Sequence, residues 1–388
     1  MKKNLFMTAA AIAALLTGCS TDEEIANIET SAKNAIGFNI VSNSAETKAT
    51  IYGPNSKDFG FDVFAFDNLG NYFMGKEGEH GYTQNEDLSF THDGVQIIPT
   101  EEGNWVYKNA EEVAYWPTTN SLDFYAVSPT NFDAQYYYSH YLWSIKSDKQ
   151  TIVYTTTNEF QTNLKDLDVM YAVAKGQTKD TKQGVVQLNF KHILSQVLFR
   201  AKVQYKSMTV TIKEMRIYNI ALGGTFTFPS ADVEPTLTNW TSTKGYSKVI
   251  IKNSNTTDVV ASSINTPVDI IGTSNPMLFI PQTLTAWNTQ VGAPMSKKDA
   301  DKAENSFQSY LEVTCKIEQN GATLHNGPLY IPFGTEWQPG KRYIYTLIFG
   351  GGYDDKGLPI LTPITFEPTV EPWANASGYT PDVPAYTN

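Results

Sequence analysis

The sequence is poor in the residues that disulfide scaffolds, metal sites and nucleic-acid interfaces require. Its 388 residues include 2 cysteines and 5 histidines, and 40 acidic residues outnumber 29 basic ones, for a formal net charge of −11. Nucleic-acid-binding proteins typically carry basic runs that are interleaved with aromatic side chains. The sequence contains no such run. We therefore expect no nucleic-acid partner.

Motifs for catalysis and metal binding are also missing. The histidines are His80, His92, His140, His192 and His325. They show no HExxH or paired-ligand spacing, and the chain has no GxSxG nucleophile elbow. Asp354 and Asp355 are adjacent in a glycine-rich turn, but a calcium site needs further spaced oxygen ligands. We expect a protein that is not an enzyme and that needs no metal or cofactor.

The one long apolar run lies at the N-terminus and ends at a cysteine. Lys2 and Lys3 precede residues 5–16, which are apolar except for one threonine and are too few to span a bilayer. This pattern predicts a signal peptide over residues 1–18. Leu16-Thr17-Gly18-Cys19 resembles the lipobox of bacterial lipoproteins, in which the cysteine receives a diacylglyceryl group. Each buried methylene then contributes about 0.8 kcal/mol to anchoring. The alternative is an ordinary signal peptide with an incidental cysteine.

An acidic cluster, residues 20–24, follows Cys19. It resembles the surface-export signal of some lipoproteins of anaerobic Gram-negative bacteria, and it also fits a solvated tether. Lipidation of Cys19 leaves Cys315 without a disulfide partner. The fold must therefore depend on apolar cores, for which 22 Tyr, 20 Phe and 7 Trp supply the area.

Strand patterns dominate the rest of the chain. Residues 193–205 and 311–318 alternate between apolar and polar side chains, as half-buried strands do. The inward faces are Ile193, Ser195, Val197, Phe199, Ala201, Val203 and Tyr205 in the first segment, and Leu311, Val313, Cys315 and Ile317 in the second. Cys315 is thus predicted to be a buried small apolar residue with no reactive role.

Denser apolar runs predict strands that are buried on both faces. They are residues 59–67, 275–282 and 342–349. Clusters of glycine and proline at residues 217–226, 324–334, 338–343 and 349–357 predict hairpins and connections. Amphipathic helices are scarce, so we predict an all-β protein built from β-sandwiches. The polar, lysine-rich segment from Ala174 to Gly184 is the predicted domain boundary.

Several segments in order resemble the fimbrillin-like proteins, a family of surface-fimbria lipoproteins related to major fimbrillins. They are FDVFAFD (61–67), VAYWPTTNSLDFYAVSP (113–129), DLDVMYA (166–172), VVQLNFKHILSQVLFRA (185–201) and GKRYIYTLIF (340–349). The resemblance extends from Cys19 to Trp373. The fold alone can also explain these residues. We expect Trp116 to cover a sandwich core, and His192 to be a core or edge histidine whose hydrogen bonds are satisfied.

The resemblance implies two transthyretin-like β-sandwich domains in tandem. With the predicted boundary, the chain divides into a signal peptide (1–18), a lipidated tether with a removable first strand (19–48), and sandwiches at 49–180 and 181–388. It also implies an assembly route. A lipoprotein precursor reaches the outer membrane and is cut by a trypsin-like protease. The first strand leaves, and a strand from another fimbrial subunit takes its place by β-strand addition, so that surface fimbriae form and support adhesion to a host or glycan ligand.

The sequence contains the parts that this route needs. Ile36, Phe38 and Ile40 alternate with polar or small residues, as in a short strand with one apolar face. Lys48 follows and precedes Ala49, as the family's processing site implies. A solvated loop lysine is the alternative reading of Lys48. Stalk, tip and anchor roles stay open, because prolines interrupt the C-terminal strand at Pro363, Pro368 and Pro372 and confine it to an edge.

A surface glycan-binding lipoprotein is the alternative function. It would share the lipobox, the tether and the sandwiches, and it would use exposed aromatic rings as stacking platforms. The segment NFDAQYYYSHYLW, residues 131–143, is the aromatic stretch that this reading favours. It offers no reason for a removable first strand followed by a lysine.

Overall fold

The computed structural model describes residues 34–40, 60–78, 80–82, 90–100, 104–130, 140–155, 168–242, 246–272, 276–289, 308–353, 359–361 and 364–372. Strands are the principal secondary structure of these residues, so the all-β prediction is confirmed. Short 3₁₀ turns occur at η3 (Ala110–Glu112), η5 (Thr181–Gly184) and η6 (Leu237–Asn239). No helix in the described ranges has the length and apolarity needed to cross a membrane.

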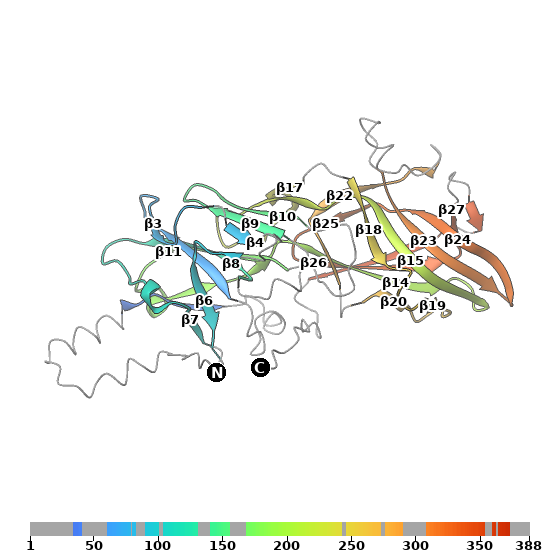
Figure 1. Cartoon of the computed structure of the whole chain (residues 1–388), viewed down its shortest axis with the longest axis horizontal. Helices are drawn as coiled ribbons and strands as arrows, with labels where there is room; N and C mark the ends of the chain where they lie inside the picture. Colours follow the sequence, from blue (N-terminus) through green and yellow to red (C-terminus); the bar gives the residue numbers. More distant parts are fainter. Residues whose placement is uncertain are drawn as a thin grey trace, which may run out of the picture.

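Two large sheets occupy one end of the elongated molecule (Figure 1). The β2 sheet has the order β13 (Lys191–His192), β11 (Met170–Gln177), β8 (Leu122–Ser128), β2 (Phe61–Phe66), β6 (Val95–Pro99), β7 (Trp105–Tyr107), with β3 (Tyr72–Met74) paired to β2. The β9 sheet has the order β17 (Trp240–Ser242), β16 (Gly223–Thr227), β10 (Gln150–Thr155), β9 (His140–Ile145), β4 (His80–Tyr82), β5 (Phe90–Thr91).

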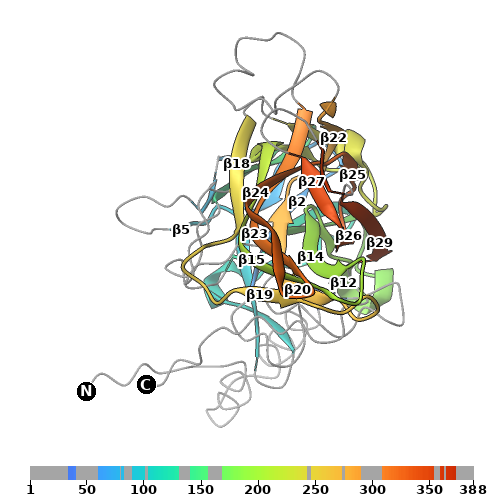
Figure 2. The ribbon, with the colours of Figure 1, turned by 90° about the vertical axis from the view of Figure 1, so that its right-hand side faces the viewer.

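Two further sheets form the other end, which Figure 2 views along the long axis. The β14 sheet has the order β20 (Val268–Ile271), β14 (Ser195–Val203), β26 (Lys341–Phe349), β29 (Thr365–Pro372), with β21 (Met277–Phe279) paired to β14. The β15 sheet has the order β18 (Tyr246–Lys252), β15 (Met208–Ala221), β23 (Gln308–Gln319), β24 (Ala322–Pro332), β27 (Gly351–Tyr353), β28 (Pro359–Leu361). At its margins β19 (Val259–Ala261) pairs with β15, and β22 (Gln282–Ala286) pairs with β23 and with β25 (Thr335–Trp337).

Three apolar cores hold these layers together. The β14/β15 core lies between the β14 and β15 sheets, and the β2/β9 core lies between the β2 and β9 sheets. A third core, here called the β1 core, covers the opposite face of the β2 sheet beneath β1 (Gly37–Ile40) and β12 (Val185–Leu188). The β2 strand is therefore apolar on both sides, as its dense sequence predicts: Val63 enters the β1 core and Phe64 enters the β2/β9 core.

The predicted alternation is correct for the second segment and only in part for the first. From Leu194 to Phe199 the first segment is buried on both faces, and Gln196, at a position expected to face outward, is 0% exposed. Leu311, Val313, Cys315 and Ile317 are fully buried in the β14/β15 core. In the other segment, Tyr205 was expected inside but is 43% exposed, because β14 ends at Val203 and a turn follows. Burial raises the pKa of the Cys315 thiol to about 12, as expected for a non-reactive core cysteine.

Two of the predicted turn clusters are strands instead. Residues 217–226 run from β15 into β16 with only Leu222 between the two strands. Gly224 fits where a Cβ would come within 2.7 Å of the Thr241 carbonyl oxygen, so it serves close strand approach and not a turn. The segment 324–334 lies largely within β24, which pairs with β23 through Pro328 opposite Thr314.

Strand pairing also crosses the predicted boundary. The β16 and β17 strands, within residues 223–242, complete the β9 sheet, where Phe226 lies opposite Ile152 of β10. The β15 strand just before them belongs to the β15 sheet. The tandem division at residues 49–180 and 181–388 stays a prediction, and the strand order shows that residues 223–242 are integral to the β9 sheet.

Candidate functional site

The predicted site residues divide between described and undescribed parts of the chain. Cys19, Lys48 and Ala49 lie outside the described residues. The predicted first strand is present as β1, and it carries Phe38 and Ile40, with Ile36 immediately before it. The candidate site therefore consists of β1 and the groove that it fills.

The β1 strand lies parallel to β12, with Gly37 opposite Val185 and Ile40 opposite Leu188. Its alternating pattern sets which side chains enter the β1 core: Ile36 is 1% and Phe38 is 7% exposed. Ile40 is half-buried against the same core. The two buried side chains are thus the principal apolar contacts of β1.

Aromatic rings surround Phe38 on several sides. Its ring centroid lies 6.1 Å from that of Phe61, 5.9 Å from Tyr107 and 6.0 Å from Phe124, with the rings edge to face. The three rings come from β2, β7 and β8, so three strands of the β2 sheet shape one socket. Edge-to-face geometry is a favoured arrangement of aromatic pairs. The socket therefore fits a flat ring.

Hydrogen bonds to the main chain fix the start of β1. The Ile36 amide donates to the Ala114 carbonyl oxygen at 2.9 Å, and the Tyr107 hydroxyl donates to the Ile36 carbonyl oxygen at 2.9 Å. Trp116 donates its amide to the Asn34 carbonyl oxygen at 2.9 Å. Burial raises the pKa of the Tyr107 hydroxyl above its usual range, which keeps it a donor.

Trp116 closes the groove near the start of β1. Its indole Nε1 donates to the Gly184 carbonyl oxygen at 3.0 Å, and its ring lies 5.9 Å from that of Phe124. It is 7% exposed in the β1 core, so the prediction that Trp116 covers a core is confirmed. Gly184 has φ +79° and approaches the indole closely, which explains a glycine at this position.

Sequence reasoning missed the groove's walls. The β7 strand, with Trp105 and Tyr107, was not predicted, because three residues are too few to show the alternation of a strand. The β12 strand carried a usable signal: Val186 and Leu188 are buried and alternate with Val185 and Gln187. What no local pattern reveals is that β12 pairs with a strand 148 residues away.

Two histidines form carboxylate pairs that stabilise the β2 sheet. His92 Nδ1 lies 3.0 Å from Asp62 Oδ1, and burial raises the pKa of the Asp62 carboxyl. His192 Nδ1 lies 2.9 Å from Asp168 Oδ2, and both side chains are largely buried. The prediction that His192 is a satisfied core or edge histidine is confirmed.

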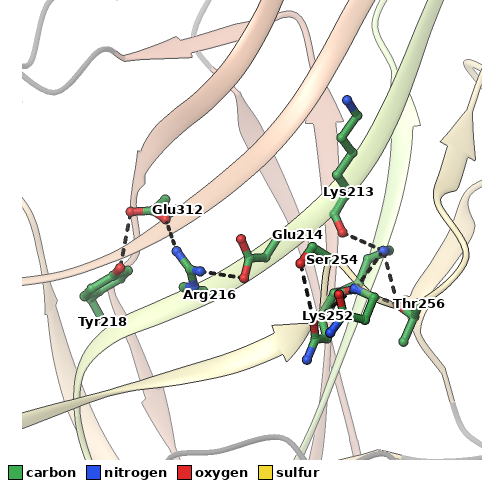
Figure 3. A network of polar contacts seen from close by, with 10 residues as sticks. Lys213, Glu214, Arg216, Tyr218, Lys252, Ser254, Thr256 and Glu312 are labelled. Carbon is green, nitrogen blue, oxygen red and sulfur yellow. Dashed lines mark hydrogen bonds and ion pairs between the residues drawn. The ribbon is translucent and has the colours of Figure 1, made fainter.

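A second polar network lies on the β15 sheet (Figure 3). Arg216 bridges Glu214 and Glu312, at 2.6 and 2.7 Å, and the Tyr218 hydroxyl donates to Glu312 at 3.2 Å. Lys252 is buried nearby and donates to the Lys213 carbonyl oxygen at 2.7 Å. Burial lowers the pKa of this amine. Pairing of β15 with β23 and β18 explains the contacts to Glu312 and Lys252, and Glu214 lies two residues before Arg216 on β15 itself.

The described residues offer no cluster of three or more metal-ligating side chains. The aromatic stretch favoured by the glycan-binding alternative is described from residue 140 onward. There Tyr141 and Trp143 are 0% and 1% exposed in the β2/β9 core, so neither ring is a surface platform. Residues 131–139 lie outside the described residues.

The C-terminal strand β29 forms an edge of the β14 sheet (Figure 2). It pairs antiparallel with β26, and Pro368 lies opposite Tyr345. Ile364, just before it, is buried in the β14/β15 core, whereas Val370 is 56% exposed. The edge position agrees with the inability of proline to donate to a ladder.

The chain is similar to one family of known proteins and to several solved structures. A family model described as "Fimbrillin-like" matches residues 42–373. A fimbrial protein from Bacteroides vulgatus ATCC 8482 has a similar solved structure: TM-score 0.50, 14% identity, covering 88% of this chain and 99% of that one. The tip fimbrial protein Mfa3 from Porphyromonas gingivalis, with C-terminal truncation, gives a TM-score of 0.35 at 9% identity, over 83% and 96% of the two chains. No curated protein shows significant similarity.

Proposed function

The chain belongs to the fimbrillin-like family, and from this membership we propose that it is a structural, tip or accessory subunit of cell-surface fimbriae that contributes to adhesion. The family match begins at residue 42, just beyond β1, and continues to residue 373 in the C-terminal part of the chain. Fimbrial subunits act by binding neighbours and surfaces, so assembly is the activity to explain. We propose that assembly occurs by strand exchange.

One observation carries the strand-exchange proposal: the β2 sheet has a core on each face, and β1 contributes to only one. Among the described residues, the β2/β9 core contains no side chain of β1. The β1 core contains Ile36 and Phe38. Loss of β1 would therefore uncover part of one face of the β2 sheet, with Val186, Leu188 and Trp116 still in place, while the core on the other face stays intact.

The uncovered groove would need a replacement strand. Burial of Ile36 and Phe38 contributes about 1.5–3 kcal/mol each, and the open groove would expose Phe61 and Phe124 beside the unpaired edge of β12. An unpaired strand edge beside an apolar slot is a template for β-strand addition. Head-to-tail addition between copies does not close on itself, so it propagates into a filament.

Processing and anchoring complete the proposal. Cys19 is lipidated and holds the precursor in the outer membrane, and a trypsin-like protease cuts between Lys48 and Ala49. The segment 19–48 then leaves with β1, and the subunit joins other fimbrial subunits at the cell surface. A host or glycan ligand bound by the fimbria accounts for adhesion.

Limited trypsin digestion of the purified full chain tests this function. We expect cleavage after Lys48, release of the segment that carries β1, and oligomers visible by size-exclusion chromatography with light scattering. The Lys48→Ala variant should stay intact and monomeric. Lys57→Ala is the matched control, because Lys57 is the next basic residue along the chain, and it should assemble like the wild type.

Two results would count against the proposal. Oligomers formed equally well by uncut Lys48→Ala would show that cleavage is not the trigger. A cleaved chain that stays monomeric, and that accepts no added strand peptide, would show that the groove is not an acceptor.

A further inference from the structure

We propose that the β1 groove selects its incoming strand by a four-residue pattern, aliphatic, any residue, aromatic, amide, read parallel to β12. This inference rests on the proposed function, in which the groove accepts a strand from another subunit. The pattern is that of Ile36 to Asn39. It defines the partner chemically: an extended segment that places a ring two residues after an aliphatic side chain.

The aromatic position carries the strongest discrimination. Phe38 lies within 6.1 Å of three ring centroids, all edge to face. Each such pair adds a favourable term beyond simple area burial, because the positive ring edge meets the negative face. A leucine at this position would bury apolar area but form none of the ring pairs. The socket therefore distinguishes an aromatic donor from an aliphatic one.

The aliphatic position combines a sequence-specific contact with a general one. The Ile36 side chain is 1% exposed, so its pocket excludes polar side chains. Its main chain is held on both sides, by Ala114 and by the Tyr107 hydroxyl. Main-chain bonds hold any sequence equally. Tyr107 therefore adds affinity through its hydroxyl without selecting a sequence, and at the inward positions the selection comes from the two side chains.

The amide position sets register and direction. Asn39 Nδ2 donates to Gln187 Oε1 at 3.1 Å, and these two residues lie opposite each other in the parallel ladder. A one-residue slip would turn Ile36 and Phe38 to the outer face, because side chains alternate along a strand. The second position is tolerant: a Cβ on Gly37 would lie 3.4 Å from Val185 Cγ2, an ordinary contact that alanine can make.

Peptide exchange on the cleaved full chain tests this pattern. The full chain is cut after Lys48, the released segment is left in solution, and fluorescent peptides are followed by anisotropy. The native probe is AIGFNIV, residues 35–41. Three altered probes carry Phe38→Leu, Asn39→Ala, or Phe38 and Asn39 in exchanged positions, which moves the ring to the outer face of the strand. We expect the native probe to bind more tightly than each altered probe.

The expected changes are specific. Phe38→Leu should weaken binding at least about tenfold, which corresponds to about 1.4 kcal/mol, and the probe with Phe38 and Asn39 exchanged should not compete. Asn39→Ala should weaken binding a few-fold in the wild type but not in Gln187→Ala, because the partner amide is then gone. Tyr107→Phe should weaken the native and Phe38→Leu probes by the same factor.

The outcomes separate this inference from the function on which it rests. If the native probe does not exchange at all, the groove accepts no strand and the proposed function fails. If the native probe binds and the Phe38→Leu and exchanged-position probes bind equally well, strand acceptance stands and the selection pattern is overturned.

Discussion

Phe38→Ala in the uncut chain should open the β1 groove before any protease acts. The substitution removes a ring that is 7% exposed and forms three edge-to-face pairs. Truncation of a buried phenylalanine costs about 3–5 kcal/mol. We expect about 3 kcal/mol, because β1 is short and Ile40 is only half-buried beside it. At about 1.4 kcal/mol per tenfold, the undocked fraction should rise about 100-fold.

Hydrogen exchange measured by mass spectrometry reports this opening directly. Amides of residues 36–40 should lose about 100-fold in protection, whereas amides of β10 should keep theirs, because the β2/β9 core does not contain Phe38. Asn39→Ala is the matched control. Asn39 is exposed and forms an exposed side-chain bond, so its removal should change protection less than about fivefold.

Protection of β1 that is unchanged in Phe38→Ala would show that the socket does not hold the strand. An equal loss in β10 would show that β1 and the β2/β9 core open together, and a subunit without β1 would then not remain folded.

Three more predictions follow from single residues. Cys19→Ala should abolish incorporation of a fatty-acid analogue during metabolic labelling, and equal labelling of variant and wild type would exclude lipidation there. Because burial raises the thiol pKa to about 12, Cys315 should react with Ellman's reagent at pH 8 only after unfolding; rapid reaction of the native protein would contradict its burial. Burial raises the carboxyl pKa of Asp62, which faces His92, above 3.8. The folded state then binds the proton more tightly, so stability should fall as pH rises from 3.8 through the raised value. Asp62→Asn should flatten that slope in urea melts.

The local alternation of side chains was sufficient to predict which residues are buried in strands that have one apolar and one polar face. Cys315 and its alternating neighbours were placed inside because period two is a property of one strand. Tyr205 continued the pattern of β14 in sequence, yet the ladder ends at Val203. Where pairing stops depends on the partner strands, and a single segment does not contain that information.

Pairing between distant segments was the larger gap. The apolar face of β1 was predicted, but its parallel partner β12 was not, since the two are linked only by the assembled fold. Residues 217–226 pass from the β15 sheet to the β9 sheet but were predicted to form a turn. Glycine occurs both in turns and where strands approach closely, so its presence does not distinguish the two. The socket for Phe38 could not be anticipated, because its rings come from three separate strands.

In the proposed assembly route, the covalent link between β1 and the rest of the chain would keep the groove closed in the precursor, and its loss would let the groove open. A strand that is covalently linked to its groove has an effective concentration of about millimolar. The same strand released at micromolar concentration is about a thousandfold more dilute, a loss of about 4 kcal/mol. Docking of two buried side chains, Ile36 and Phe38, contributes a comparable amount. The proposed cleavage after Lys48 would therefore remove an advantage as large as the contacts themselves, and a strand presented by a neighbouring subunit could then replace β1 without a stronger set of contacts.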